Sequence, residues 1–227
     1  MHGIGGGVAA ALHGAEKRCP QACEGWPVAF LPSQPPSDPA RGRAYSQDMT
    51  DEFLPETTAL LERTPRVVGA LLEGLPEPWL GTPDTPDGWT PRDVVGHLIS
   101  AELDDWIPRV EMILGDGSSR PFEPFDRFAH VERDVGVALG RLIDRFQELR
   151  QTNLAKLSEL VSDDDLDRVG RHPELGEVTM RHLLATWAVH DLDHVAQIYS
   201  ALAGSYEGEV GPWKAYLGIL LRRDPTG

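Results

Sequence analysis

Two histidines four positions apart carry the clearest chemical signal in this sequence. His190 and His194 lie in a helical pattern, so one turn separates them and both imidazoles project toward a single metal ion. His97, in an earlier amphipathic stretch, supplies a third imidazole. Three imidazoles leave one or two coordination positions free for water or substrate, whereas a structural zinc site is normally closed by four protein ligands. The three histidines therefore predict an open metal centre.

The histidine pair continues an apolar stripe of the same predicted helix. Leu183 and Trp187 precede His190 at steps of four and three residues, which directs the imidazoles toward the interior and places Trp187 beside the site. A buried imidazole requires a hydrogen-bond partner or a metal ion. Core histidines satisfied by hydrogen bonds are therefore the alternative to metal ligation.

Two acidic residues share a helix face with His97. Asp93 precedes His97 by one turn, where it either accepts the imidazole N–H that points away from the metal or favours the positive end of the helix, the role we prefer. Asp104 follows His97 by two turns and either reaches the substrate or, as we prefer, lies in solvent. Both are secondary candidates for the site.

Other histidines and acids near these motifs lack the spacing of metal ligands. Asp191 and Asp193 fall outside the ligand face, where we expect them to be solvated or hydrogen-bonded to neighbours. His182 lies on a different face of the predicted helix, and His172 precedes a proline in a predicted loop. Together with His130, these histidines are predicted to be structural or surface residues.

Helical periodicity dominates beyond the N-terminal segment, and no stretch gives a convincing strand pattern. Thr90 and the proline after it form a strong helix start, and Pro108 predicts a kink in that helix. Thr64 and Pro65 interrupt the first helix as an N-cap and a first-turn proline. The predicted helices span residues 56–75, 91–114, 128–161, 180–204 and 213–221.

This pattern predicts an all-α protein: an up-down-type four-helix bundle with a disordered N-terminal extension and a short C-terminal helix. Residues 77–88 and 162–177 are predicted loops. Residues 1–48 hold six prolines and seven glycines, a composition typical of disorder, and Met49 is a plausible alternative start. We expect residues 49–227 to form the bundle.

The net charge of −15 and the lack of a basic stripe argue against a nucleic-acid partner. Cys19 and Cys23, both in the N-terminal segment, are the two cysteines of the chain and are interpreted as incidental thiols. Neither a signal peptide nor a membrane span is recognisable. These features predict a cytoplasmic protein without nucleic-acid or membrane partners.

Several of these segments together resemble the DinB-like family of metal-binding four-helix bundles, over residues 49–203. The resemblance rests on Gly88–Glu102, on the long 125–160 helix, on His172–Gly176 and on His190–Ile198. It implies that zinc, nickel or a similar divalent ion binds His97, His190 and His194. Glu102 falls where the family often carries an acid.

The family resemblance also implies classes of reaction. Relatives include bacillithiol- and mycothiol-dependent transferases and a maleylpyruvate isomerase. The leading hypothesis is a metal-dependent enzyme acting on a small-molecule substrate or low-molecular-weight thiol, by thiol S-transfer or by metal-assisted hydrolysis. The rival hypothesis is a non-catalytic, stress-related metal-binding or interaction bundle, which could form a homodimer through a helix face. A haem pocket is the third alternative.

Overall fold

The computed structural model describes residues 52–85 and 87–221, which belong to one compact unit. The expectations for residues 1–48, including the two cysteines, lie outside the described residues. The helices are α1 (Phe53–Leu61), α2 (Thr64–Leu72), α3 (Glu77–Leu80), α4 (Pro91–Asp104), α5 (Trp106–Gly115), α6 (Ala129–Arg133), α7 (Leu139–Leu160), α8 (Met180–Gly204) and α9 (Gly218–Leu221), with 3-10 turns at Asp163–Asp165 and Gly211–Tyr216 and strands β1 (Val169–His172) and β2 (Gly176–Thr179).

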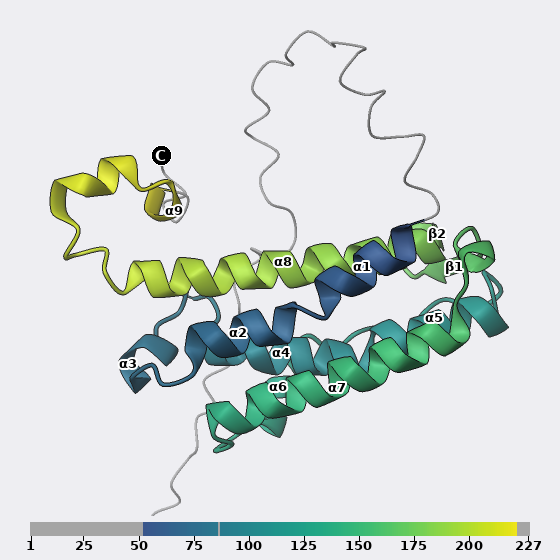
Figure 1. Cartoon of the computed structure of the whole chain (residues 1–227), viewed down its shortest axis with the longest axis horizontal. Coiled ribbons are helices and arrows are strands. Elements are labelled where there is room, and N and C mark those ends of the chain that lie inside the picture. The colour runs from purple at the N-terminus through teal and green to yellow at the C-terminus, as the bar shows by residue number, and fades with distance from the viewer. Residues whose placement is uncertain (1–51, 86, 222–227) are drawn as a thin grey trace, which may run out of the picture. The chain divides into compact units, whose positions relative to one another are not determined.

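Four helical rods form a bundle, as the sequence predicted (Figure 1). The rods are α1 continued by α2, α4 continued by α5, then α7, then α8. Helix α4 packs against both α7 and α8, while α1 contacts α8 and α2 contacts α7. The interior between α4, α7 and α8 is therefore where side chains from three rods meet.

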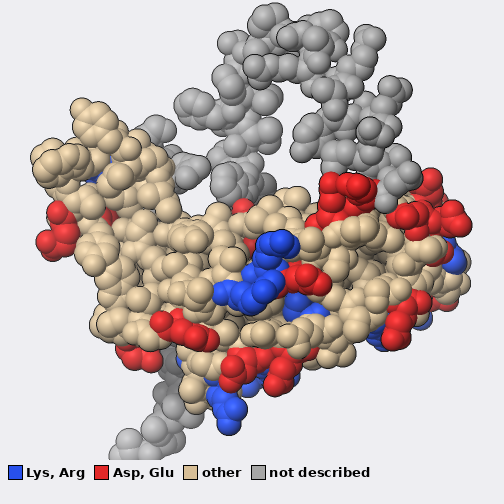
Figure 2. All heavy atoms as spheres, in the orientation of Figure 1, with Lys and Arg blue, Asp and Glu red and all other residues tan. Residues whose placement is uncertain are grey.

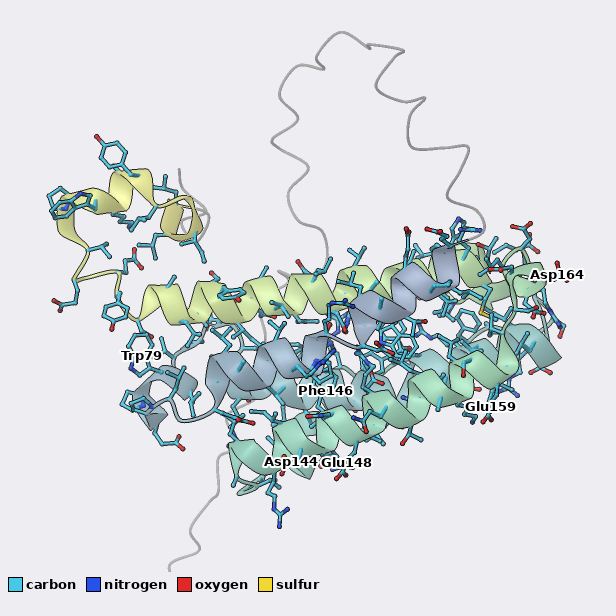
Figure 3. All side chains as sticks on the ribbon, viewed as in Figure 1. Trp79, Asp144, Phe146, Glu148, Glu159 and Asp164 are labelled. Carbon is cyan, nitrogen blue, oxygen red and sulfur yellow. The ribbon has the colours of Figure 1, made fainter. Side chains whose placement is uncertain are left out.

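Helix α7 illustrates how the pattern of residue types buries one face of each rod. Leu142 and Phe146 are buried, whereas Asp144 and Glu148 are exposed. Figure 3 shows Phe146 pointing into the bundle and the two acids pointing away from it. Each fully buried side chain of this size contributes about 1.5–3 kcal/mol to folding, so the bundle is held mainly by these apolar faces.

Two of the rods are interrupted, and proline chemistry accounts for both positions. Pro65 lies in the first turn of α2, where the missing N–H is tolerated, and α1 ends four residues earlier at Leu61. In the second rod the break falls at Asp105, three residues before the expected kink at Pro108. The ring of Pro108 conflicts with the carbonyl group four residues before it, so the helix has to break ahead of the proline.

The predicted helix over residues 128–161 begins too early. The structure has the short helix α6, then an irregular segment in which Gly136 adopts a φ of 73°, and α7 starts only at Leu139. Val131 and Val135, whose spacing fits the apolar face of the predicted helix, are 54% and 78% exposed. Their spacing matches a helical stripe, but both side chains are mostly exposed, so the stripe does not continue into the core here.

The expectation that the chain contains no strand is also wrong. Strands β1 and β2 form an antiparallel hairpin in which Val169 pairs with Thr179 and His172 with Gly176. Each strand has only four residues and no clear alternation of apolar and polar types, which hid it from the pattern. Gly176 has a φ of 77°, a conformation that favours glycine in the tight connection.

The predicted 77–88 loop likewise contains one turn of helix, α3.

On the face shown in Figure 2, lysine and arginine side chains are interspersed with acidic ones. None of the described helices combines the length and apolarity needed to cross a membrane.

Candidate metal centre

Three histidines from two helices converge in the bundle interior. His97 comes from α4, and His190 and His194 come from α8. One ring nitrogen from each lies within 4.8 Å of the others. The Nε2 atoms of His97 and His190 are 3.1 Å apart, and the His97 side chain is buried. The structure thus brings together the three residues that the sequence singled out, and we call this set the metal centre.

Hydrogen bonds at Nδ1 set the orientation of two of these imidazole rings. His97 Nδ1 lies 3.3 Å from the backbone carbonyl oxygen of Arg127, and His194 Nδ1 lies 2.9 Å from Oε1 of Gln197. Because these oxygens only accept hydrogen bonds, each Nδ1 carries the proton and each Nε2 presents a lone pair. His190 Nδ1 is buried and has no hydrogen-bond partner among the described residues.

Burial keeps all three imidazoles neutral at physiological pH. Burial, together with the smaller effect of the neighbouring histidines, lowers the pKa of His97 to about 3 and that of His190 to about 2. The pKa of His194 is lowered as well, mainly by burial, against the opposing effect of its bond to Gln197. Neutral imidazole is the form that binds metal ions.

The donor set fits a divalent metal ion. Zinc–imidazole bonds are about 2.0–2.1 Å long, so two nitrogens on one tetrahedral zinc ion lie roughly 3.3 Å apart. The 3.1 Å between Nε2 of His97 and Nε2 of His190 is close to this separation. Imidazole ligands suit zinc, nickel, copper and iron alike, so the geometry supports a divalent ion without choosing among them.

Aromatic rings form the walls of the metal centre. The ring of Trp89 lies 4.6 Å from that of His97 and is stacked 6.0 Å from that of His194. Phe125 approaches His97 at 5.5 Å, and Trp106 approaches His190 at 5.1 Å. Walls of this kind exclude water and line small-molecule sites in many proteins.

The helix start next to Trp89 fixes this wall. Asp93 and Thr90 form a capping box, in which Thr90 N donates to Asp93 Oδ2 at 3.0 Å and Asp93 N donates to Thr90 Oγ1 at 3.1 Å. This is the capping role preferred for Asp93 from the sequence. The position beside His97 Nδ1 belongs instead to the Arg127 carbonyl, so the second role considered for Asp93 is wrong.

The other candidates lie away from the ligand atoms. Asp104 is exposed, as expected of a solvated acid. Glu102 and Trp187 are buried, and the Trp187 indole N–H donates to Glu102 Oε1 at 3.2 Å. Asp191 was expected to be solvated or bonded to neighbours; it is buried and paired with Arg150 on α7.

Sequence reasoning missed two residues at the metal centre. Gln197 follows His194 by three residues, a spacing that places both on one helix face and could have identified it. His130, predicted to be structural or on the surface, is only 3% exposed, and its ring lies 5.2 Å from Trp89 and 6.2 Å from His97. Neither of its ring nitrogens has a hydrogen-bond partner among the described residues.

Known proteins are similar to this chain in sequence and in fold. A protein of Bacillus cereus named "Putative metal-dependent hydrolase" is 27% identical over 160 residues, which cover 69% of this chain and 89% of the relative. A protein of Bacillus thuringiensis subsp. konkukian with a name of the same kind matches to the same extent. The solved structure of YfiT from Bacillus subtilis, described as a probable metal-dependent hydrolase with an unusual four-helix bundle topology, is similar with a TM-score of 0.58 and 25% identity, over 70% of this chain and 89% of YfiT.

A family model provides the broadest comparison. The model of the DinB superfamily matches residues 60–198, a range that includes all three histidines of the metal centre and most of the bundle. The match extends over more than half of the chain. Sequence, fold and the histidine cluster agree, and the chain belongs to the DinB superfamily.

Proposed function

We propose that this protein is a metal-dependent hydrolase in which His97, His190 and His194 hold one divalent ion, zinc or nickel. The observation that carries the proposal is the pair of Nε2 atoms 3.1 Å apart, one of them on a ring whose proton is committed to the Arg127 carbonyl. His97 Nε2 therefore offers a lone pair, and His190 offers a second one when its proton is on Nδ1, so that one cation replaces the hydrogen bond between the two Nε2 atoms. The names of the Bacillus relatives support hydrolysis as the reaction class.

The chain's own residues prepare the site for such chemistry. When bound, a divalent ion polarises a substrate oxygen and can lower the pKa of water to about 7. The three neutral imidazoles add no charge of their own, so they leave the full charge of the ion available. Trp89 and Phe125 exclude bulk water from one side, which strengthens electrostatic interactions inside the site.

Thiol S-transfer is the second candidate, and the neutral donor set favours it. Three imidazoles leave a divalent charge uncompensated, and a site of this kind attracts an anionic thiolate as readily as hydroxide. The substrate is then a low-molecular-weight thiol together with a small electrophile. The ligand residues stay the same in both reactions, so the choice between them depends on turnover measurements.

The first experiment is elemental mass spectrometry on tag-free protein, with wild type beside His97→Ala and His190→Ala. About one zinc or nickel ion per chain, lost in both variants, supports the proposal. Wild-type protein that stays metal-free after incubation with zinc and nickel contradicts it. Assays with ester, amide and thiol substrates then separate the reactions, and tight metal binding that stabilises the fold without turnover supports the non-catalytic alternative.

Other expectations from the sequence stay predictions. They are the homodimer, the cytoplasmic location, and the absence of nucleic-acid and membrane partners. Light scattering coupled to size-exclusion chromatography measures the first of these directly.

A further inference from the structure

A second polar cluster lies in the bundle interior, and it consists of charges. Arg150 on α7 is 1% exposed and binds two buried carboxylates, Glu102 on α4 and Asp191 on α8. Asn153 donates to Glu102 Oε2 at 2.9 Å, and the Trp187 indole donates to Glu102 Oε1. We refer to these five residues as the Arg150 cluster.

The guanidinium of Arg150 has no donor left for a ligand. Its Nε and Nη2 donate to Glu102 Oε1 at 2.9 and 2.7 Å, Nη1 and Nη2 donate to Asp191 at 2.6 and 3.0 Å, and Nη1 also donates to the Leu61 carbonyl at 2.7 Å. These five bonds use all five N–H groups of an arginine. The role of Arg150 therefore lies in joining protein groups.

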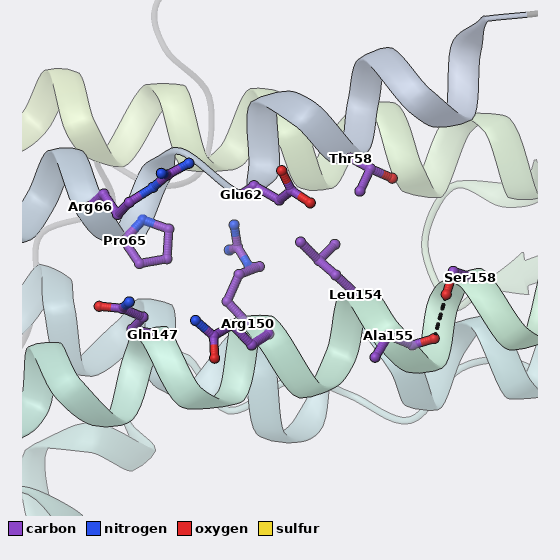
Figure 4. Close-up of a pocket in the computed structure, with 10 residues that line it drawn as sticks. Thr58, Glu62, Pro65, Arg66, Gln147, Arg150, Leu154, Ala155 and Ser158 are labelled. Carbon is purple, nitrogen blue, oxygen red and sulfur yellow. Dashed lines mark hydrogen bonds between the residues drawn. The ribbon is translucent and has the colours of Figure 1, made fainter.

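A surface groove of about 500 Å³ beside Arg150 does not change this conclusion (Figure 4). Glu62, Arg66 and Gln147 are among the residues that line it, and Arg150 lies between α7 and the junction of α1 with α2. An anion entering the groove finds no free N–H on Arg150, because both carboxylates already occupy that side chain.

The Arg150 cluster also donates hydrogen bonds to backbone carbonyls at the breaks of the two interrupted rods. In a continuous helix the Leu61 carbonyl would accept from the N–H of residue 65, but Pro65 has none, and Arg150 supplies the donor instead. Asn153 Nδ2 donates at 2.7 Å to the Glu102 carbonyl, in the last turn of α4, where carbonyls lack partners in their own helix. Through α7 the cluster thus reaches α1, α4 and α8.

The Arg150 cluster and the metal centre link the same two helices at neighbouring levels. On α4, Glu102 follows His97 by five residues, and on α8, Asp191 follows His190 directly. Helices α4 and α8 run in opposite directions, since His97 contacts His190 and the later Glu102 contacts the earlier Trp187. Any rotation or sliding of α8 that breaks the Asp191–Arg150 pair also moves His190.

We propose that the Arg150 cluster is the positioning device of the metal centre: by fixing α8 against α4 through α7, it sets His190 Nε2 at chelating distance from His97 Nε2. The effect of the cluster on metal affinity rests on the proposed metal function. Its effect on the Nε2–Nε2 separation does not, because that distance exists in the metal-free protein. Arg150, Glu102 and Asp191 are positioning residues, because none of them supplies an atom to the three-nitrogen set.

The test removes the three charges together. In Glu102→Gln/Arg150→Met/Asp191→Asn no charge is left buried without a partner, so the variant is expected to fold, as replaced buried ion clusters often do. The matched control is Glu111→Gln/Lys156→Met, which removes an exposed ion pair between α5 and α7. Zinc affinity is measured by competition with a chromophoric chelator, and cobalt spectra report the ligand geometry.

We expect the zinc affinity of the triple variant to be lower than that of wild type by a factor of about ten or more. Its cobalt spectrum should differ from that of wild type, while the control variant matches wild type in both measurements. Crystal structures of the metal-free proteins give a readout that needs no metal: the separation between His97 Nε2 and His190 Nε2 should widen in the triple variant. An unchanged separation in a folded triple variant overturns the positioning role. A wild-type protein that binds no metal overturns the proposed function alone, because the separation still tests the cluster.

If the triple variant does not fold, Arg150→Lys provides the same comparison. It keeps the positive charge but offers three donors where arginine offers five. Weaker zinc binding and a wider Nε2–Nε2 separation support the proposal, and wild-type values for both overturn it.

Discussion

The metal centre and the Arg150 cluster are two polar regions in one apolar interior, and they differ in how their polar atoms are satisfied. In the metal centre two Nε2 atoms face each other at 3.1 Å, and His190 Nδ1 has no partner among the described residues. In the Arg150 cluster all five guanidinium donors have acceptors. In this interior the unpartnered nitrogen belongs to the three-histidine set, whereas the saturated guanidinium joins helices of the bundle.

Removing one metal ligand should have the largest effect of these changes on metal binding. His190→Ala leaves two imidazoles and is expected to reduce bound zinc or nickel from about one ion per chain to near zero. Elemental mass spectrometry after gel filtration measures this. His182→Gln, on the exposed face of the same helix with the capping bond kept possible, is the control. Retained metal in His190→Ala would show that the histidines are not the ligands.

Removing the arginine alone should affect folding most. Arg150→Met leaves Glu102 and Asp191 buried without their counterion, which is expected to lower the free energy of unfolding by about 3–5 kcal/mol. Lys156→Met, from an exposed ion pair, should cost no more than about 1 kcal/mol. Urea unfolding of the metal-free proteins measures both. Equal losses in the two variants would remove the distinction between buried and exposed pairs.

Acid should destabilise the metal-free protein through its histidines. Burial and the neighbouring histidines lower the pKa of His97 to about 3 and that of His190 to about 2, below the 6.5 that both regain on unfolding. The unfolded chain then binds more protons, so this stability is nearly complete above about pH 7 and is lost as the pH falls toward 3, by up to about 1.4 kcal/mol per pH unit for each group. Urea unfolding between pH 7 and pH 5 should show a loss of about 2 kcal/mol for each group.

The double variant His97→Ala/His190→Ala provides the comparison for the pH experiment. Its stability should depend less on pH over the same interval, because the two groups with lowered pKa values are gone. A slope identical to that of wild type would assign the acid sensitivity to other residues.

The smallest effect concerns the orientation of one ligand. Gln197→Ala removes the acceptor at His194 Nδ1 and is expected to weaken zinc binding about tenfold with little change in stability. Gln151→Ala, an exposed glutamine on α7, should leave the affinity unchanged. Chelator competition measures both constants. An unaffected Gln197→Ala protein would show that the packing of α8 alone orients His194.

The sequence predicted the metal centre better than the Arg150 cluster, and the reason is chemical. A histidine pair at helical spacing is unusual enough to stand out, whereas charged residues are expected in solvent. The pattern nevertheless held a signal: Arg150 and Asn153 follow Phe146 at steps of four and three, and so continue the buried stripe of α7. A charge on an apolar stripe indicates a buried partner on another helix.

The bundle could be predicted because long helices repeat their apolar spacing over many turns. The hairpin could not, since Val169–His172 and Gly176–Thr179 are too short to show a period. The contact between His97 and α8 needed tertiary structure as well: spacing places a residue on a face, but only the packing of α4 against α8 brings two faces to one point.

The contact between Arg150 and the Leu61 carbonyl has a consequence for sequence evolution. Pro65 leaves the Leu61 carbonyl without a donor in its own helix, and Arg150, 85 positions after the proline, donates to it instead. If Pro65 is replaced by a residue with an N–H, the Leu61 carbonyl no longer needs Arg150 as its donor. If Arg150 is lost, the proline leaves that buried carbonyl without a hydrogen bond. Across an alignment of relatives, the two positions are expected to co-vary.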